Sequence, residues 1–323
     1  MDPPAHGSAA GMDALLLCAG LGTRLRPLTD ERPKPLVPVL DRPLAAFALD
    51  HLAAAGVRRV VANAFHLADQ IEPALAPICA ARGMDLTVLR EPTLLGTGGA
   101  IRHALSRLGD EFVVFNGDVL ARPDLARARE AHRRLGARVT MVLREDPRAT
   151  ALGAIELDAL GRVRRILDEG PPADFPTRRC VFTGVYVVSS AVAADLPIEG
   201  CIVRHTLRRL LARGEVVAGV LDEGPWFDLG TLEHYAQANF ALATGALRWS
   251  GVTSPKDGVF TPVWADHSML SAPVIIGTGA VVAPAATIAR AIVWDGATVR
   301  ASVRDAVVTR GAVVPLSVGV GAS

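Results

Sequence analysis

The sequence lacks a long hydrophobic run, although half of its 323 residues are hydrophobic and its mean hydropathy is +0.31. No apolar segment approaches the roughly 20 residues that a membrane-spanning helix needs, so we expect no membrane partner. An excess of one charge is also lacking. The net charge of +1 excludes a nucleic-acid binder that relies on bulk electrostatic attraction. Aromatic residues make up only 5% of the chain, too few for us to expect base-stacking platforms for single strands.

Cysteine is rare and has no functional spacing. The chain has four cysteines, and they show neither Cys-x-x-Cys pairs nor metal-ligand spacing. We therefore expect buried thiols in a reducing compartment, most simply the cytoplasm. Residues 1–11 contain no basic segment followed by a long apolar one, so we expect a disordered tail and no signal peptide.

Lysine is nearly absent. Only Lys34 and Lys256 occur among 34 lysines and arginines, so almost every position that needs only positive charge holds arginine. Arginine presents a planar fork, whereas lysine presents a compact charge on a flexible stem. We therefore expect Lys34, which lies between two prolines, to occupy a site that needs a point charge.

Residues 15–40, LLLCAGLGTRLRPLTDERPKPLVPVL, are the most informative stretch of the chain. The opening apolar run is typical of a buried parallel strand. Gly20 and Gly22 then allow a tight turn and a close approach of the backbone to a ligand, and the N–H groups of such a loop bind phosphate oxygens. Arg24 follows, and the flanking prolines hold Lys34 between residues of fixed φ. This combination predicts a polyphosphate site.

Two better-known phosphate loops do not fit this stretch. The dinucleotide fingerprint needs a third glycine where Arg24 and Leu25 stand, and the P-loop needs Gly-Lys-Ser/Thr. The string GLGTRLRPLT…RPKPLVPV instead closely resembles the signature of the sugar-1-phosphate nucleotidylyltransferases. The resemblance implies that Arg24 stabilises the β- and γ-phosphates and that Lys34 lies against the α-phosphate. The nucleotide-binding residues that it implies here are Leu17, Ala19, Gly20, Gly22, Thr23, Arg24 and Lys34.

Two aspartates are candidate metal ligands. Asp118 ends an Asn-Gly-Asp turn directly after the apolar stretch 111–115, and a carboxylate beside a glycine suits a hard cation such as Mg²⁺. Asp228 lies in WFDLGT, which resembles the family's W-x-D-x-G-T string. The resemblance implies that both aspartates bind the Mg²⁺ cofactor and that Asp118 is catalytic. Read alone, the first motif is an ordinary turn, and Asp228 could cap a helix expected from about Thr231.

The base and sugar sites are implied by the same resemblance. The string LGTGGAI from Leu95 looks most like the base-lining loop of members that use GTP. It implies base contacts at Gly96, Thr97 and Gly98, although a loop before a helix is the plainer interpretation.

Gly153, Glu169 and Gly184 would face the sugar. Many members carry Glu-Lys-Pro, with the lysine on the sugar phosphate, whereas this chain has Gly170 in place of that lysine. Arg178 or Arg179 could substitute for it.

The pattern of apolar segments predicts an α/β fold. Short apolar runs at 57–64, 85–89 and 111–115 alternate with helical patterns at 43–55, 66–82 and 99–108. This alternation is typical of a Rossmann-like, doubly wound, mostly parallel sheet covered on both faces. Shorter strands are expected from Val139 onward. Ligands of such sheets bind beyond the carboxyl ends of the strands, where both the glycine loop and Asp118 stand.

The C-terminal sequence is repetitive. Ile276, Val282 and Ile288 recur every six residues, each followed by a small residue, which is the hexapeptide signature of a left-handed parallel β-helix. No histidine follows His267, which argues against the acyltransferases that share this repeat. We expect the repeat to serve homo-oligomerisation or regulation. The expected organisation is a tail (1–11), a nucleotidyltransferase domain (12–247), a linker (248–271) and a short β-helix (272–323).

The resemblance implies that the chain makes a nucleotide sugar and pyrophosphate from a nucleoside triphosphate and a sugar 1-phosphate. GTP and mannose 1-phosphate are the favoured pair. Uridylyl transfer to N-acetylmuramate 1-phosphate or another hexose 1-phosphate is the alternative within the family. A non-catalytic regulatory homologue that binds a nucleotide sugar is the alternative from another class, although Arg24, Lys34, Asp118 and Asp228 are all present. A dinucleotide-dependent oxidoreductase is disfavoured by the missing glycine.

Overall fold

The computed structural model describes residues 12–167, 176–255, 257–261 and 267–316. The expected tail at 1–11 and the motif residues Glu169 and Gly170 lie outside this range. The chain forms two compact units: a first unit of residues 1–20 and 45–226, and a second unit of residues 21–44 and 227–323. The second unit thus joins part of the signature stretch to the C-terminal residues. The domain boundaries expected at 247 and 271 remain predictions.

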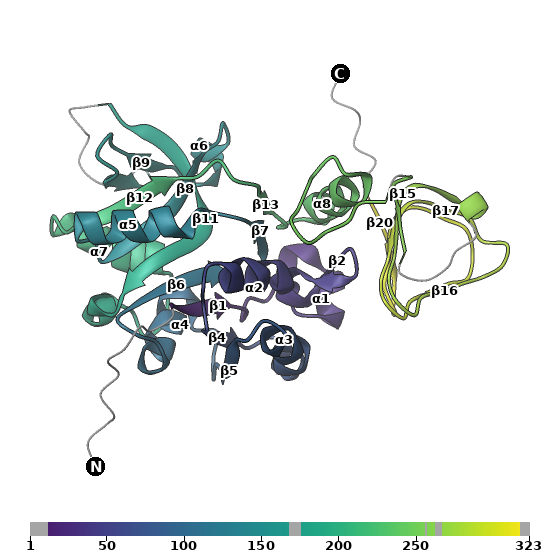
Figure 1. Cartoon of the computed structure of the whole chain (residues 1–323), viewed down its shortest axis with the longest axis horizontal. Helices are drawn as coiled ribbons and strands as arrows, with labels where there is room; N and C mark the ends of the chain where they lie inside the picture. Colours follow the sequence, from purple (N-terminus) through teal and green to yellow (C-terminus); the bar gives the residue numbers. More distant parts are fainter. Residues whose placement is uncertain (1–11, 168–175, 256, 262–266, 317–323) are drawn as a thin grey trace, which may run out of the picture. The chain divides into compact units, whose positions relative to one another are not determined.

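The first unit is built on a nine-stranded mixed sheet (Figure 1). The strand order along its main path is β10-β9-β11-β6-β1-β4-β5, and β8 joins β12 to β11. β1, β4, β5 and β6 run parallel, whereas β11 is antiparallel to β6, β8 and β9. The strands are β1 (Asp13–Leu17), β4 (Arg59–Ala64), β5 (Asp85–Arg90), β6 (Glu111–Asn116), β8 (Val139–Glu145), β9 (Ile155–Leu157), β10 (Val163–Ile166), β11 (Arg178–Ser189) and β12 (Val217–Leu221), with the short β7 (Val119–Ala121) outside the sheet.

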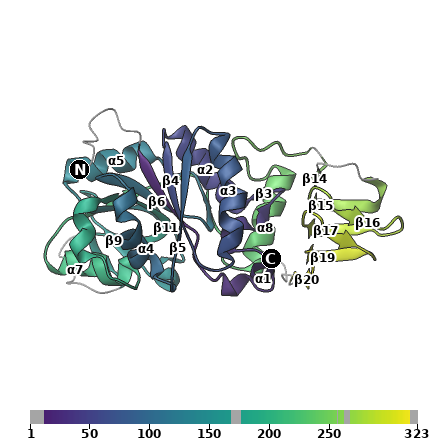
Figure 2. The same cartoon turned by 90° about the horizontal axis from the view of Figure 1, so that it is seen from below.

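Helices cover both faces of this sheet. Ile101 of α4 and Leu210 of α7 pack in one core cluster with Val114 of β6 and Met141 of β8. The opposite face receives α5, where His132 contacts the Thr140 hydroxyl at 2.9 Å. Figure 2 shows α5 on one side of the sheet and α4 and α7 on the other. The helices are α2 (Leu44–Ala54), α3 (Ile71–Ala80), α4 (Gly96–Ala104), α5 (Leu125–Leu135), α6 (Ala149–Leu152) and α7 (Arg208–Ala212), with the shorter turns η3 (Ala68–Gln70), η4 (Leu105–Arg107), η5 (Ser190–Asp195) and η6 (Ile202–Leu207).

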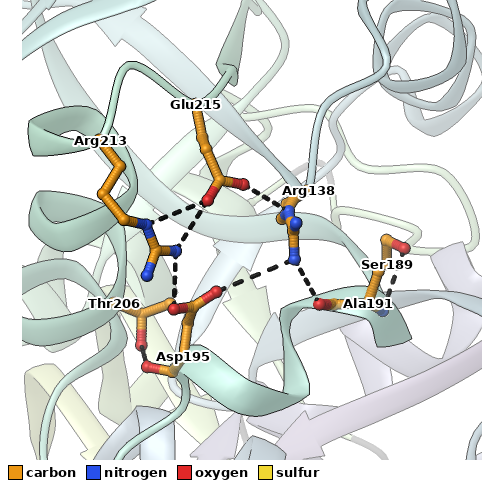
Figure 3. A network of polar contacts seen from close by, with 7 residues as sticks. All are labelled: Arg138, Ser189, Ala191, Asp195, Thr206, Arg213 and Glu215. Carbon is orange, nitrogen blue, oxygen red and sulfur yellow. Dashed lines mark hydrogen bonds and ion pairs between the residues drawn. The ribbon is translucent and has the colours of Figure 1, made fainter.

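The amino ends of β8 and β12 are fixed by a polar network (Figure 3). Arg138, just before β8, bonds to Glu215, just before β12, at 2.6 Å. Arg213 bridges Glu215 at 2.8 Å and Asp195 at 2.7 Å. Arg138 also donates to the Ala191 carbonyl oxygen at 2.6 Å. This network lies at the strand ends opposite to those where ligands of such sheets bind, so we assign it a structural role.

The second unit combines the signature segment with the C-terminal strands. Among the residues that the structure describes in either unit, no helix is both long and apolar enough to cross a membrane. β13 (Trp226–Asp228) lies where the chain passes from the first unit to the second. The elements of the second unit are η1 (Thr23–Leu25), α1 (Leu28–Glu31), η2 (Lys34–Leu36), β2 (Pro38–Val39), β3 (Arg42–Pro43), α8 (Leu232–Thr244), β14 (Val259–Phe260), η7 (His267–Met269), β15 (Leu270–Ile276), β16 (Val281–Val282), β17 (Ile288–Val293), β18 (Thr298–Val299), β19 (Val303–Val308) and β20 (Val313–Pro315).

The C-terminal strand stack, as we call β14–β20, has the parallel pairing expected of a coiled repeat. β15, β17 and β19 lie in parallel register, with Ile276, Val293 and Val308 in successive layers. All three of these side chains are buried. β16 and β18 form a second parallel pair. β20 then turns back antiparallel onto β19, which covers the open edge of β19 and ends the stack.

Candidate active site

The carboxyl ends of three parallel strands meet in the first unit. In the register of the sheet, Leu17 of β1 lies between Asn63 of β4 and Asn116 of β6. The amide of Gly117 donates to the Leu17 carbonyl oxygen at 2.9 Å. Burial, and to a lesser degree the Asp118 carboxylate, raises the pKa of the Cys18 thiol well above its usual range. The structure therefore brings the Asn-Gly-Asp turn to the end of the signature strand, as the sequence predicted.

A buried polar chain links the signature strand to the expected base loop. Cys18 donates its backbone N–H to Asn63 Oδ1 at 2.7 Å, and Asn63 Nδ2 donates to Glu91 Oε1 at 2.7 Å. The other Glu91 oxygen accepts the Leu95 N–H at 2.9 Å. Asn63 and Glu91 are 4% and 6% exposed. One carboxylate thus fixes both the end of the β4 strand and the start of the loop.

The glycines of the base loop are explained by packing within the chain. The N–H groups of Gly98 and Gly99 both donate to the Gly200 carbonyl oxygen, at 2.8 and 3.4 Å, and Gly200 N–H donates to Leu95 oxygen at 2.8 Å. Cβ atoms on Gly96 and Gly98 would lie 2.8 and 3.0 Å from the Gly200 oxygen. The N–H groups of Gly98 and Gly99 are therefore not available to a ligand, because the chain itself uses these donors.

Thr97 is similarly engaged, since its hydroxyl oxygen accepts the Ile202 N–H at 3.0 Å. The contacts of Thr97 and of the glycines fasten the start of α4 to the segment 197–202. A base contact at Gly96, Thr97 or Gly98 remains a prediction. It would have to use their exposed surfaces or the Thr97 side chain, because the Gly98 N–H is already committed.

Gly22 brings the signature loop against Lys34 in the second unit. Its φ of +62° is one that side chains rarely adopt, and its carbonyl oxygen accepts the Thr29 hydroxyl at 2.9 Å. A Cβ on Gly22 would lie 2.7 Å from Thr29 Cγ2 and 3.2 Å from Lys34 Cβ. Lys34 is only 5% exposed. Because Gly22 has no side chain, the loop can lie directly on the stem of a buried lysine.

Arg24 and Asp228 approach the same glycine. A Cβ on Gly230 would lie 3.0 Å from both carboxylate oxygens of Asp228 and 3.1 Å from Arg24 Nη1. The simpler interpretation, that Asp228 caps the following helix, is wrong. Thr231 caps α8, and its side chain accepts the His234 N–H at 3.2 Å. The two signature strings, far apart in sequence, therefore meet within the second unit.

Of the residues expected to face the sugar, Gly184 lies at the end of β6. Gly184 has a φ of +91° and lies where the β11–β8 register shifts. A Cβ on Gly184 would lie 3.1 Å from Asn116 Nδ2. Within the described part of the chain, the buried Asn116 Oδ1 has no hydrogen-bond partner. Trp226 Nε1 donates to the Thr183 oxygen at 2.9 Å and so supports the irregular segment of β11. Asn116 is thus a candidate acceptor that the sequence analysis missed.

The other described residues expected at the sugar lie near parts of the chain other than β6. Gly153 has a φ of +93°, and a Cβ there would lie 2.5 Å from Leu167 Cδ2. Glu169 lies outside the described residues. The two candidate replacements for the missing lysine are both near acids: Arg178 lies 3.7 Å from Glu145, and Arg179 lies 3.5 Å from Glu156. Their role at a sugar phosphate remains a prediction.

The carboxylate set is compatible with magnesium. Across the described ranges, no three His, Cys, Asp or Glu side chains gather as a metal-binding group. Mg²⁺ in nucleotide enzymes keeps several waters and is held by one or two carboxylates plus substrate phosphates, so it does not require such a group. The unpartnered Asn116 Oδ1, two residues before Asp118, could accept from a metal-bound water. Each of the two carboxylates, Asp118 and Asp228, is thus of the chemical type that Mg²⁺ prefers, and their role as its ligands remains a prediction.

Known proteins resemble this chain over most of its length. Residues 13–245 match the model of the nucleotidyl transferase family. The chain is 33% identical over 304 residues to the mannose-1-phosphate guanylyltransferase of Mycobacterium tuberculosis, covering 90% of this chain and 82% of the relative. It is 30% identical over 296 residues to the glucose-1-phosphate thymidylyltransferase of Streptomyces antibioticus, covering 88% and 78% of the two chains.

A solved structure shares the fold. HddC from Yersinia pseudotuberculosis aligns with a TM-score of 0.60 and 24% identity, over 71% of this chain and 98% of that one. This similarity supports the mixed α/β nucleotidyltransferase fold. The sequence matches identify the class of enzyme. The chain belongs to the nucleotidyl transferase family and is a sugar-1-phosphate nucleotidyltransferase.

Proposed function

We propose that the chain transfers a guanylyl group from GTP to mannose 1-phosphate and forms GDP-mannose and pyrophosphate. The observation that carries this choice is the similarity to the Mycobacterium tuberculosis mannose-1-phosphate guanylyltransferase along nearly the whole chain. The LGTGGAI string, which looks most like that of GTP-using members, agrees with it.

The proposed reaction is an in-line displacement at phosphorus. An oxygen of the sugar phosphate attacks the α-phosphorus, and the bond from that phosphorus to the pyrophosphate oxygen breaks. The attacking phosphate is already anionic near neutral pH, so no general base is needed. The residues must therefore position two negatively charged reactants and offset their repulsion.

Lys34 and Arg24 are the proposed cations. Lys34 is buried against Gly22. Water screens a buried ammonium group only weakly, so it interacts strongly with the negative charge that develops on an α-phosphate. Arg24 is exposed on η1, and its guanidinium can bind the β- and γ-phosphates and the leaving pyrophosphate. Leu17, Ala19, Gly20, Gly22 and Thr23 would supply the backbone of the phosphate loop.

Asp118 and Asp228 are the proposed ligands of Mg²⁺. When bound, the ion supplies charge neutralisation for phosphate oxygens. For the sugar, we propose that Asn116 and the glycines at 153 and 184 form one wall of the site. The positive φ of both glycines keeps side chains out of that wall. Glu169 would bind sugar hydroxyl groups.

Pyrophosphate release with Mg²⁺ tests the proposal. GTP, UTP, dTTP, CTP and ATP would each be paired with mannose, glucose, N-acetylmuramate and heptose 1-phosphates. We expect the highest kcat/KM for GTP with mannose 1-phosphate. A preference for another pair would contradict the substrate assignment, and nucleotide-sugar binding without turnover of any pair would support the regulatory alternative.

Thymidylyl transfer to glucose 1-phosphate is the second candidate, because of the Streptomyces antibioticus relative. The same grid distinguishes it from guanylyl transfer. Uridylyl transfer remains the alternative implied by the sequence resemblance.

We also propose that the C-terminal strand stack is a left-handed parallel β-helix that supports homo-oligomers. Light scattering on the intact chain would test the assembly, and a monomer at micromolar concentration would contradict it. The four free cysteines agree with a cytoplasmic location.

A further inference from the structure

The segment that carries Lys34 is held at both ends by the rest of the second unit. It runs from Glu31, the last residue of α1, to Leu40, just after β2. Lys34 lies in the middle, at the first position of η2. Contacts at both ends of the segment therefore fix the position of this lysine.

The first end is held by the turn that follows β17. Arg32 Nη1 and Nη2 each donate to one oxygen of Asp295, both at 2.7 Å. The Arg32 guanidinium carbon also lies 5.1 Å from the centroid of the Trp294 ring. A bidentate pair combined with stacking fixes both the position and the plane of a guanidinium. Arg32 is therefore oriented by two consecutive residues of the strand stack.

The adjoining Glu31 contacts the stack as well. Its Oε1 accepts the Gly311 N–H at 3.2 Å and also accepts the Thr309 hydroxyl. Thr309 directly follows β19, which pairs in parallel with β17. Two successive layers of the stack thus each hold one of two neighbouring residues just before Lys34.

The second end is held by α8, which is joined to the same turn. The Tyr235 hydroxyl donates to the Pro38 carbonyl oxygen at 2.6 Å and accepts from Trp294 Nε1 at 3.0 Å. Asn239 Oδ1 accepts the Leu40 N–H at 2.7 Å. Tyr235, Trp294 and Asn239 are each at most 1% exposed. Trp294 therefore touches Arg32 with its ring face and reaches Pro38 through one tyrosine.

The backbone near this end is strained. Leu40 has a φ of +58°, a conformation that costs a residue with a side chain of order 1–2 kcal/mol. Leu40 is the first of the two residues that turn β2 into β3, since Val39 pairs with Arg42, and a two-residue hairpin turn requires such a backbone. The hydrogen bond from the Leu40 N–H to Asn239 Oδ1 then fastens this turn to α8.

The turn itself is fixed by the stack. The Trp294 N–H donates to the Val308 carbonyl oxygen at 2.8 Å. A Cβ on Gly277 would lie 2.5 Å from the Asp295 nitrogen. The layers on either side of the turn therefore leave Trp294 and Asp295 little freedom to move.

We propose that Trp294 and Asp295 are positioning residues for Lys34, so that the C-terminal strand stack takes part in catalysis within its own chain. The inference rests on the proposed function only in that Lys34 is taken to act on the α-phosphate. Neither residue touches substrate. They act through Arg32, Tyr235 and the backbone that joins Arg32 to Pro38.

Matched substitutions test this role. Asp295→Asn leaves one hydrogen-bonding oxygen but removes the charge that pairs with Arg32, and Trp294→Phe keeps a ring but removes the N–H to Tyr235. Asp305→Asn is the control. It makes the same chemical change in the stack. In the described part of the chain, the Asp305 side chain pairs with Arg290 at 2.7 Å rather than with residues 31–40.

Kinetics should separate positioning from general stability. A displaced catalytic group can cost a factor of up to about 100 in rate, so we expect kcat to fall at least about tenfold in both test variants. The KM for each substrate should change less than kcat. Asp305→Asn should keep the wild-type kcat. Test variants whose kcat matches that of Asp305→Asn would overturn the proposal.

Amide hydrogen exchange gives a second readout that does not depend on turnover. We expect faster exchange at residues 36–40 in Asp295→Asn and Trp294→Phe, but not in Asp305→Asn, under conditions where all variants are folded. If the wild type turned over no substrate while this difference appeared, the proposed function would fail and the coupling would stand. Unchanged exchange in both test variants would overturn the coupling itself.

Discussion

Replacing Glu91 by glutamine tests the polar chain beneath the active site. The two Glu91 oxygens accept from Asn63 Nδ2 at 2.7 Å and from the Leu95 N–H at 2.9 Å, in surroundings that leave the residue 6% exposed. A glutamine has only one acceptor oxygen, so its NH₂ group must face one of the two donors. One buried hydrogen bond is lost, and two donors then face each other.

The size of the effect follows from these contacts. A hydrogen bond to a charged group contributes about 1.5–3 kcal/mol, and a buried donor left unpaired costs about 1–3 kcal/mol. These two energies partly describe the same lost contact, so they do not add in full. We therefore expect Glu91→Gln to lower the free energy of unfolding by about 2–4 kcal/mol. We also expect a raised KM for the nucleoside triphosphate, since Leu95 begins the loop that the resemblance assigns to the base.

Urea unfolding and steady-state kinetics measure the two effects. At a slope of about 3 kcal/mol/M, the loss would lower the midpoint by roughly 1 M urea. Asp69→Asn is the matched control, because it also replaces a carboxylate by an amide. Asp69 forms an ion pair with Arg90, and its side chain is 88% exposed. Such exposed pairs contribute at most about 1 kcal/mol. Equal midpoints for the two variants would refute the assignment of Glu91 as a shared buried acceptor.

Three further predictions follow from other sites. Gly184→Ala should destabilise the protein by about 1–2 kcal/mol because of the positive φ, and it should raise the KM for the sugar phosphate; an unchanged KM in kinetic assays would remove Gly184 from the sugar wall. Asp195→Ala should lower the free energy of unfolding by about 1–2 kcal/mol, through loss of its bonds to Arg213 and Arg138, without changing KM; a raised KM would contradict the structural role of the network in Figure 3. The hydrogen bond from Arg148 lowers the pKa of Asp146 to about 2, so its stabilisation is complete above the unfolded pKa of about 3.9 and is lost as the pH falls through 2. Unfolding midpoints should therefore drop more steeply in acid for the wild type than for Asp146→Asn, and parallel pH profiles would refute this.

Much of the α/β core was predictable because local patterns specify it. The apolar run before the glycine loop became β1, and the runs at 57–64, 85–89 and 111–115 became β4, β5 and β6 with shifts of a residue or two. β1, β4 and β6 are almost entirely buried, since both faces of the sheet are covered there, whereas exposed and half-buried residues alternate along the edge strand β5. The helical pattern at 43–55 likewise became α2.

The contacts within the site were less predictable because they join distant residues. Asn63 and Glu91 are each unremarkable in sequence, and only the parallel register of β1, β4 and β5 brings them to Cys18 and Leu95. A polar residue at the end of each apolar run was the available signal. The partner of the LGTGG glycines could not be predicted either, because Gly200 lies in a segment with no pattern of its own.

The sequence also did not predict that residues 21–44 form one compact unit with residues 227–323. Nothing in the hexapeptide repeat indicates that Asp295 pairs with Arg32, which stands in the signature stretch. Arginine and aspartate are frequent at surfaces, so neither residue is distinctive by type. Only the register of β15, β17 and β19 places the turn at Trp294 next to α8 and α1.

The most direct test of the proposed function is the identity of the product made by the intact chain. GTP, mannose 1-phosphate and Mg²⁺ would be incubated with wild-type protein and with Asp118→Asn, and the nucleotide product would be identified by mass spectrometry. We predict GDP-mannose and equimolar pyrophosphate from the wild type, and a rate lower by orders of magnitude from the variant. Formation of GDP-mannose at the same rate by folded Asp118→Asn would contradict the site, and its absence with the wild type would contradict the proposed function.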